Sequence, residues 1–291
     1  MTQSQTKGMV LATSAYLIWG FFPLYFDLLR SVSPLEILAQ RIIWSLIVTL
    51  GLSVFLGLHY RWGRIIRHPR QIALLGLSAS LIGINWLVYL WAVNQHQVVV
   101  SSLGYFMSPV VSLILARVFF KETLHPLQRL AGWLALLSIG WEIVILGYFP
   151  WISLVLALAF SLYGVVRKYC EVDSINGMTI ETLWLLIPAL LWISLQPTAT
   201  LSFATTPVIT ALLMGSGLIS ALPLVLFSMA ARRIDLSIIG FLMVLNPTMQ
   251  FLIGVCIFHE SFPIQRIVTF VLIWLAMACF LTGMVKKHRS P

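Results

Sequence analysis

Charged residues are scarce in this chain of 291 residues, because Asp, Glu, Lys and Arg together make up only 9% of it. A soluble domain ordinarily contains about 25% charged residues and about 45–50% apolar ones. Here hydrophobic residues reach 60%, and the charge-poor stretches cover nearly the whole length rather than one end. These proportions exclude a soluble fold and also a soluble protein held by one or two anchors. The sequence therefore predicts an all-α membrane protein with many transmembrane helices.

Sequence motifs of catalysis and metal binding are also missing. The three cysteines, Cys170, Cys256 and Cys279, are scattered and follow no pairing pattern, so we expect no disulfide framework. No two of the six histidines share a helix face at ligand spacing, so we expect no metal site. The sequence has no Walker motif, no GxSxG and no HExxH. We therefore expect neither ATP hydrolysis, nor a cofactor, nor enzymatic activity.

Uncharged runs predict ten transmembrane spans, since a helix needs roughly 20 apolar residues to cross the hydrocarbon core. The first run is too long for the core of a signal peptide, and we expect it to remain as a helix. All connections are short, which leaves no room for a soluble domain. The expected spans are 8–28, 35–57, 72–93, 98–119, 127–147, 150–168, 178–196, 207–231, 236–258 and 263–285.

Basic residues predict the orientation of the chain. The 18 Lys and Arg outnumber the 9 Asp and Glu, which in a membrane protein reflects basic cytoplasmic loops rather than nucleic-acid binding. If both termini are cytoplasmic, every basic residue except Arg30, Arg41 and Arg266 lies on the cytoplasmic side. We therefore expect an even number of crossings with both termini inside.

The second half of the sequence repeats features of the first. Pro109 precedes Glu122 by the same interval as Pro247 precedes Glu260, and each glutamate is followed by a Pro-hydrophobic-Gln-Arg string. We interpret both glutamates as structural loop residues. Glu36 and Glu181, which open the second and seventh expected spans, also match.

An odd number of spans in each half places the two halves upside down relative to each other. The sequence therefore predicts two inverted five-helix repeats, residues 1–148 and 149–291, an arrangement typical of secondary transporters.

Several residue strings accompany this repeat. They are AYLIWGFFPLYF at 15–26, EILAQRIIWS at 36–45, NW at 85–86, WAVN at 91–94, SLGYF at 102–106 and YGVVRK at 163–168. Two repeats with Trp-Gly in the first helix and a proline-centred fourth helix resemble the EamA domains of the drug/metabolite transporter superfamily. Within it, the strings are most similar to those of RarD-type proteins, the chloramphenicol-sensitive permeases.

The resemblance implies a small-molecule transporter in the bacterial inner membrane. RarD-type proteins usually have Lys, His, Glu and Asn where this chain has Asp27, Gln40, Val100 and Ser108. All four positions are polar or ionisable in the family pattern, so we expect the specificity of this chain to differ.

Arg41 is the candidate residue whose position most needs an explanation. It lies about seven residues into the second expected span, where an unpaired cation costs roughly 2.5–3.5 kcal/mol on insertion scales. One interpretation is that Arg41 faces a central cavity and binds a carboxylate or another anionic group of the substrate. The alternatives are that it reaches the outer surface, or that it pairs with Glu36 or Asp27.

Other candidates are polar, aromatic or proline residues in the spans. Buried amides can instead form hydrogen bonds between helices, worth about 0.6 kcal/mol on average. Glu36 and Glu181, each expected in the first turn of a helix, can instead have a capping role by interacting with the helix dipole, worth about 0.3–1 kcal/mol. Glu142 is interpreted as either cavity-lining or interfacial. We expect Asn85, Trp86, Tyr105, Asn246, Trp44 and Gln250 to contact substrate, and Glu36, Glu181, Pro109 and Pro247 to serve in gating or coupling.

The expected function is secondary transport of a small organic solute, such as an amino acid, a metabolite or a drug, by alternating access. The alternatives are a membrane sensor or partner subunit that transports nothing, and a membrane-embedded lipid-handling protein. A cluster of carboxylates or histidines at one membrane face would favour the last, and the sequence shows none. The expected partners are the solute and membrane lipids, with no nucleic acid, and the protein is expected to be a monomer or a homodimer.

Overall fold

The computed structural model describes residues 3–121, 124–147, 149–197, 200–231, 233–234 and 242–289. The main helices are α1 (Gln3–Gly20), α2 (Phe22–Asp27), α3 (Pro34–Phe55), α4 (Trp62–Ile66), α5 (Pro69–Asn94), α6 (Val98–Phe120), α7 (Pro126–Leu146), α8 (Trp151–Lys168), α9 (Ser174–Leu195), α10 (Pro207–Ala231), α12 (Leu245–Leu252) and α13 (Arg266–Arg289).

Membrane-spanning length is present in nine helices of the described part of the chain. The shorter apolar helix Leu245–Ile257 occupies the described part of the ninth expected span. Residues 236–241, with which that span was expected to begin, lie outside the described residues. The prediction of an all-helical membrane protein is confirmed.

Helix starts in this chain follow ordinary capping chemistry. Ser33 caps α3 by accepting a hydrogen bond from the backbone N–H of Glu36, at 3.2 Å. His125 and Gln128 form a capping box at the start of α7. Asp173 caps α9 through the backbone N–H of Asn176, at 3.0 Å. Side-chain acceptors satisfy N–H groups that a helix leaves without partners, so these helices begin at defined residues.

The first expected span is bent rather than straight. Helix α1 ends at Gly20, and α2 begins at Phe22 with Pro23 in its first turn. Because proline lacks an N–H group, it suits a helix start but interrupts a continuous helix. The bend turns Phe22 and Phe26 into the bundle, where both are buried.

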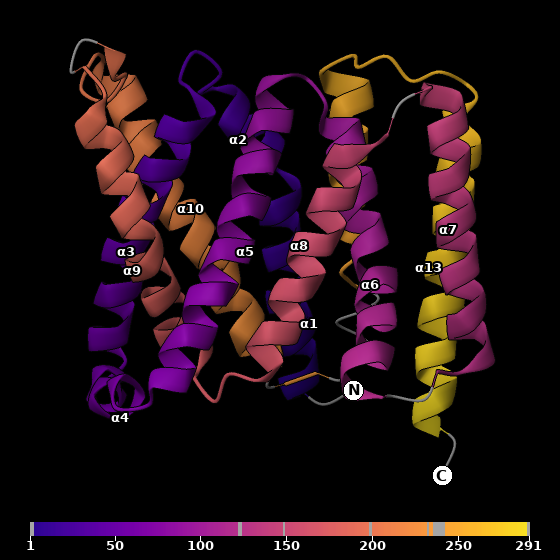
Figure 1. Cartoon of the computed structure of the whole chain (residues 1–291), viewed down its shortest axis with the longest axis horizontal. Coiled ribbons are helices and arrows are strands. Elements are labelled where there is room, and N and C mark those ends of the chain that lie inside the picture. The colour runs from indigo at the N-terminus through magenta and orange to yellow at the C-terminus, as the bar shows by residue number, and fades with distance from the viewer. Residues whose placement is uncertain are drawn as a thin grey trace.

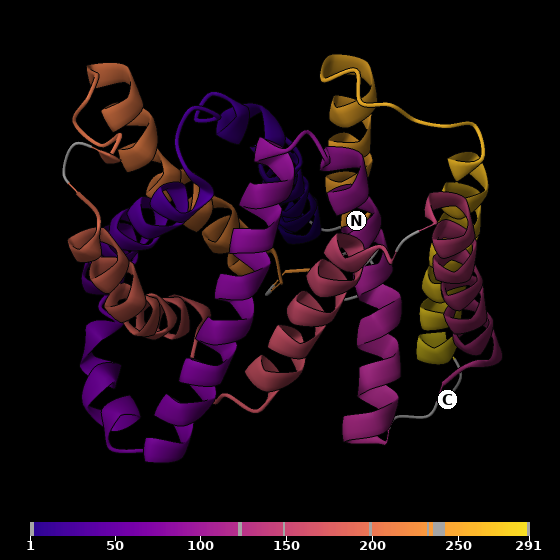
Figure 2. The same cartoon turned by 45° about the horizontal axis from the view of Figure 1, so that its top comes forward.

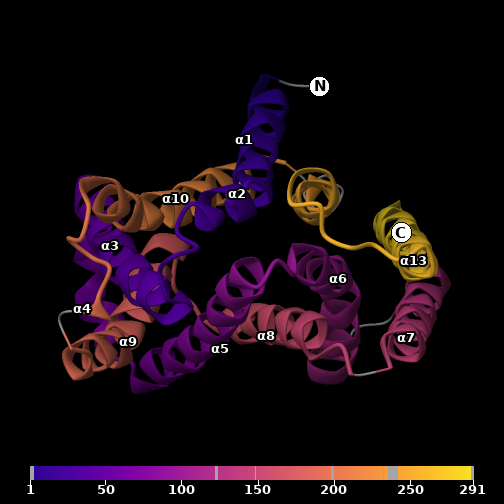
Figure 3. The ribbon, with the colours of Figure 1, turned by 90° about the horizontal axis from the view of Figure 1, so that it is seen from above.

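The long helices lie side by side in one bundle (Figures 1 and 3). Helix α3 packs against α9 and α10, and α1 packs against α10 and α12. Helix α8 crosses α5 and α6 obliquely, as Figure 2 shows. Helices α7 and α13 pack together at one side of the molecule (Figure 3). The described ends of α1 and α13 that are nearest the termini lie at the same end of the bundle (Figure 1).

The helix contacts come in matching sets. Helix α6 packs on α8 as α12 packs on α1, and α5 packs on α8 as α10 packs on α1. Helix α3 packs on α10 as α9 packs on α5. In each of these pairs, one contact turns into the other when every segment of the first five is replaced by the corresponding segment of the second five. The division into repeats 1–148 and 149–291 stays a prediction, to which we return below.

Close approach of α6 and α8 depends on a glycine. A Cβ atom at Gly104 would lie 2.7 Å from the carbonyl oxygen of Ser153, which is backbone and cannot move aside. The Ser153 hydroxyl donates to the carbonyl of Val100 at 2.7 Å, and the Ser161 hydroxyl donates to that of Ser108 at 2.9 Å. Small residues thus let the two backbones approach closely, and hydroxyls join them.

Helices α7 and α13 are joined by a buried ion pair. The Nε atom of Arg266 lies 3.0 Å from Oε1 of Glu142, and the Thr269 hydroxyl donates to Oε2 at 2.7 Å. The Glu142 side chain was expected to be cavity-lining or interfacial. In the structure both of its carboxylate oxygens contact residues of α13 instead.

Gly104→Ala should destabilise the protein by about 1–3 kcal/mol, because the new methyl group overpacks the contact between α6 and α8. Gly132→Ala in α7 is the matched control, since no atom lies within 4 Å of its added Cβ. The control should be neutral or stabilising by up to about 1 kcal/mol. Thermal unfolding in mild detergent measures both, and equal melting temperatures for the two variants would contradict the close-packing explanation.

Candidate functional site

Arg41 lies in α3 and is buried, with 3% of its surface exposed. Its Nε atom donates a hydrogen bond to the Ser220 hydroxyl of α10, at 2.6 Å. Its Nη1 atom is buried without a hydrogen-bond partner in the described structure. Burial excludes the interpretation that Arg41 reaches the outer surface. The described residues also show no ion pair between Arg41 and Glu36 or Asp27.

Aromatic rings surround the Arg41 guanidinium on several sides. Its Cζ atom lies 4.1 Å from the ring centroid of Trp86, and 5.4 and 5.5 Å from those of Phe26 and Phe22. Each such contact is worth about 0.5–2 kcal/mol, depending on desolvation. The Ser220 hydroxyl donates in turn to the carbonyl of Ser216, at 2.6 Å, so its oxygen is directed toward Arg41. These contacts offset part of the cost of a cation in the membrane and leave the N–H bonds of Nη1 without an acceptor.

Polar groups of α5 and α6 lie next to this cation. The Asn85 amide donates to the carbonyl of Leu156 in α8 at 3.1 Å, and the Tyr105 hydroxyl donates to the Asn85 carbonyl oxygen, also at 3.1 Å. Arg41 interacts electrostatically with Tyr105 and Tyr89. The Tyr89 hydroxyl is buried without a hydrogen-bond partner in this part of the structure. Four predicted residues, Arg41, Asn85, Trp86 and Tyr105, therefore gather at one place.

Asn246 and Gln250 form a separate pair. The Gln250 amide donates to Asn246 Oδ1 at 2.8 Å and approaches the carbonyl of Trp19 in α1 at 3.5 Å. No described contact joins this pair to Arg41. Trp44 is also occupied locally, because its Nε1 atom donates to Gln40 Oε1 one turn away, at 3.2 Å.

The two expected gating prolines have different settings. Pro109 lies inside α6, where it removes one helical hydrogen bond. Pro247 lies in the first turn of α12, where the missing N–H group disrupts little. Both are buried.

Glu36 joins α3 to the segment before α10. It lies in the first turn of α3, as expected, and its Oε1 atom accepts a hydrogen bond from the backbone N–H of Phe203 at 2.8 Å. The carboxylate is 2% exposed, so this contact is internal.

Glu181 is not in the first turn of its helix, and the capping interpretation of it is wrong. Helix α9 begins at Ser174 rather than at residue 178, because Asp173 caps it, so Glu181 lies about two turns inside. The proposed match of Glu181 with Glu36 fails for the same reason. Arg41 and Glu181 each stand eight residues after the capping residue of their helix.

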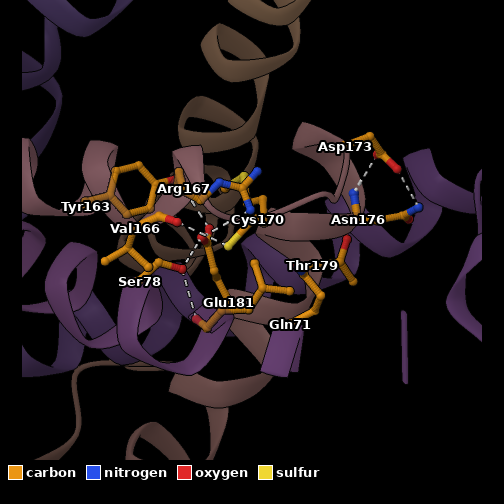
Figure 4. Close-up of polar contacts among 12 residues, drawn as sticks. Gln71, Ser78, Tyr163, Val166, Arg167, Cys170, Asp173, Asn176, Thr179 and Glu181 are labelled. Atoms are coloured by element: carbon orange, nitrogen blue, oxygen red, sulfur yellow. Dashed lines mark hydrogen bonds and ion pairs between the residues drawn. The ribbon is translucent and has the colours of Figure 1, made fainter. Parts of the chain in front are cut away.

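Glu181 and Arg41 also have matching partners. Ser78 of α5 donates to Glu181 Oε1 at 2.6 Å, the same distance as between Arg41 and Ser220 of α10. Figure 4 shows the rest of this cluster: Tyr163 donates to Glu181 Oε2 at 3.4 Å, and Arg167 Nη1 lies 3.5 Å from Oε1. The sequence placed Arg167 on the cytoplasmic side, at the end of the expected span 150–168, but did not predict its partner, because only the fold brings the end of α8 to α9.

Glu260 has a structural contact, in agreement with its interpretation as a structural loop residue. Its two oxygens accept hydrogen bonds from the backbone N–H groups of Val98 and Val99, at 2.7 and 2.8 Å, and so satisfy the start of α6. Burial raises the pKa of the Glu260 carboxyl, while these two hydrogen bonds oppose the shift. Its repeat counterpart Glu122 lies outside the described residues. Within the described ranges, no group of three or more His, Cys, Asp or Glu side chains could hold a metal ion.

Comparison with known proteins agrees with this architecture. Residues 6–141 match the model of the EamA-like transporter family. An uncharacterised transporter of Pseudomonas aeruginosa is 40% identical over 285 residues, which cover 96% of this chain and 94% of that protein. Protein RarD of Escherichia coli is 37% identical over 295 residues, 99% of each chain. The chain belongs to the EamA-like transporter family.

Within this family the chain is of the RarD type. The chloramphenicol-sensitive protein RarD of Pseudomonas aeruginosa is 31% identical over 284 residues, 95% of this chain and 93% of that protein. A protein of known crystal structure has the same fold, with a TM-score of 0.63 at 15% identity over 96% of this chain and 99% of that one. This EamA-type chain is thus a multi-pass membrane transporter.

Ser220→Ala should lower the free energy of unfolding by about 1–3 kcal/mol, because it leaves the buried Arg41 Nε without an acceptor. Ser194→Ala is the matched control. Its hydroxyl is exposed and bonds only to its own helix, so the change should stay within about 0.5 kcal/mol. Unfolding titrations of the two purified variants in one detergent provide the comparison, and a neutral Ser220→Ala would contradict the importance of this hydrogen bond.

Proposed function

We propose that this EamA-type protein is a secondary transporter of the bacterial inner membrane that carries a small organic solute with an anionic group, and that Arg41 binds this group. The observation that carries the proposal is the environment of the guanidinium. It is buried in the bundle, it has no carboxylate partner among the described residues, and its Nη1 atom makes no hydrogen bond.

A solute carboxylate supplies what the Arg41 environment lacks. A buried cation is strongly destabilising unless an opposite charge or hydrogen-bond acceptors compensate it. Arginine donates N–H groups in a planar arrangement that fits a carboxylate, and such charge-assisted hydrogen bonds are stronger than neutral ones. The rings of Phe22, Phe26 and Trp86 add apolar surface for the organic body of the solute.

We infer that transport uses alternating access between two inverted halves, residues 1–148 and 149–291. The matching helix contacts support this inference, since exchanging the halves turns each contact into its partner. Inverted repeats can exchange inward-open and outward-open shapes around a site near the middle of the membrane. Pro109 weakens α6 near Tyr105 and gives that helix a place to bend.

Relatives do not define the solute. The family pattern and this chain differ at Asp27, Gln40, Val100 and Ser108, and Oδ1 of Asp27 is buried without a hydrogen-bond partner in the described part of the chain. A buried orphan acceptor close to the site in sequence favours a solute that also donates hydrogen bonds. An amino acid, which has a carboxylate and an ammonium group, satisfies both requirements.

Arg41→Gln should weaken binding of carboxylate solutes by about 10- to 100-fold, because one charge-assisted contact is lost. A panel of amino acids and small carboxylic acids, each tested beside its neutral amide, is first screened for thermal stabilisation of the purified wild type. Acids that stabilise are then measured for affinity and for uptake into liposomes.

Arg30→Gln is the matched control for Arg41→Gln, since Arg30 is an exposed cation at the same end of the bundle. Its affinity should equal that of the wild type, and the neutral amides should bind weakly to all variants. Wild-type affinity and uptake in Arg41→Gln would show that Arg41 is not the anion site.

The orientation of the chain is tested independently of the solute. With both termini cytoplasmic, alkaline phosphatase fused after Pro197 should be exported and active, whereas the same enzyme fused after Tyr169 should be inactive. The reason is that the basic residues at the end of α8 stay on the cytoplasmic side. Activity of the Tyr169 fusion alone would reverse the proposed topology.

A further inference from the structure

A second polar cluster lies at the end of the bundle that the proposed topology makes cytoplasmic. We name Ser78, Tyr163, Arg167 and Glu181 the inner cluster (Figure 4). Glu181 is 3% exposed, and the Arg167 side chain retains 17% exposure. Just beyond Asp173, the cap of α9, a hollow of about 230 Å³ is lined by Arg61, Ile65, Glu171, Val172 and Asp173. The cluster therefore lies between the membrane interior and an open surface.

The α9 backbone is shaped to receive the Arg167 side chain. A Cβ atom at Gly177 would lie 2.1 Å from Arg167 Nη1 and 2.5 Å from Nη2. Glycine at this position therefore gives the guanidinium room beside α9, within 3.5 Å of Glu181. The Arg167 side chain thus packs against the α9 backbone at Gly177 and remains partly exposed to water.

The inner cluster joins the two proposed halves. Ser78 belongs to α5 in the first half, whereas Tyr163 and Arg167 belong to α8 and Glu181 to α9 in the second. At the opposite end of the bundle, Arg41 and Ser220 hold the matching helix pair, α3 and α10. The difference is that Glu181 has its counterion in the protein, whereas Arg41 has none in the described structure.

We propose that Arg167 and Glu181 form the latch of the inner gate. This rests on the proposed function, since alternating access requires the inner ends of α5, α8 and α9 to move apart before a solute can leave. The Arg167–Glu181 pair ties α8 to α9, and the hydrogen bond from Ser78 ties α5 to α9. Breaking the ion pair releases that end of the bundle. The partly exposed Arg167 is rehydrated as the gate opens, which distinguishes it from Arg266, whose 3.0 Å pair with Glu142 is more deeply buried.

Cys170 provides a natural reporter of this gate. It follows the end of α8, three residues after Arg167, and is half-buried, with its thiol donating to the carbonyl of Val166 at 3.5 Å. Burial raises the pKa of the Cys170 thiol, the Arg167 charge lowers it and the Glu181 charge raises it. Replacing Cys256 and Cys279 by serine leaves Cys170 as the single thiol.

The experiment measures the rate at which N-ethylmaleimide modifies Cys170 in the purified full-length protein, without any solute. Glu181→Gln, Arg167→Gln and Gly177→Ala should each increase the rate by about tenfold, because each breaks the pair and populates the open gate. Glu142→Gln is the matched control: it breaks the ion pair between α7 and α13, and should leave the rate unchanged.

Opposite charges separate gate opening from a direct effect on the thiol. If the pair acted on Cys170 only through its electrostatics, Glu181→Gln would accelerate the reaction and Arg167→Gln would slow it. Acceleration in both variants supports the latch, and a slower reaction in Arg167→Gln overturns it. Gly177→Ala keeps both charges and displaces only a flexible side chain, so an unchanged rate in that variant, purified as a folded protein, also overturns the latch.

The outcome is independent of the proposed anion site. Arg41→Gln in the same single-thiol background should label like the parent, because Arg41 lies at the other end of the bundle. If no carboxylate binds the wild type but the three latch variants label faster, the proposal about the solute fails and the gate stands. If carboxylates bind at Arg41 but the labelling rates of the three latch variants do not change, the latch proposal fails and the proposal about the solute stands.

Discussion

The cost of placing a charge in the membrane interior governs this structure. Few charged residues enter the spans, and three of them, Glu142, Glu181 and Arg41, have an identifiable compensation. Glu142 pairs with Arg266 between α7 and α13, and Glu181 pairs with Arg167 beside α9. Arg41 is compensated differently, by aromatic rings and one hydroxyl, and keeps an N–H group without a partner. An unpaired buried cation is costly, and this unsatisfied N–H group is the physical basis for the proposed binding of an anion.

The two halves place opposite charges at matching helix positions. Arg41 and Glu181 stand at the same distance from the caps of α3 and α9, and each contacts a serine of the helix against which its own helix packs. Arg41 has no carboxylate partner in the described structure, whereas Glu181 is paired with Arg167 of the same chain. In the proposed inverted repeat, the proposed binding position near one end and the proposed latch near the other share one local design, because two copies of a helix pair can carry different side chains.

Sequence patterns predicted the spans well, because runs without charge are long and the loops that separate them are polar. They misplaced the start of α9, and with it Glu181. Ser174, Asn176 and Gly177 are polar or small, so residues 174–177 were assigned to a loop. Asp173 nevertheless caps a helix that begins there, by accepting a hydrogen bond from the backbone N–H of Asn176. A cap read from the sequence would have moved the boundary by one turn. Arg167 could not be assigned in the same way, since its partner depends on how α8 and α9 pack.

Composition and the repeated strings by themselves determined that this chain is a helical membrane protein of the EamA type, because hydrophobic length and charge distribution act along the chain. They also singled out Arg41, since a cation within an apolar run is visible in one dimension. The tertiary structure decided which residues surround it. Trp86 and Ser220 are distant in sequence and approach Arg41 only because α5 and α10 converge on α3. Whether a charged side chain is buried, has an ion-pair partner or lacks one depends on packing between distant segments, and no local sequence pattern encodes it.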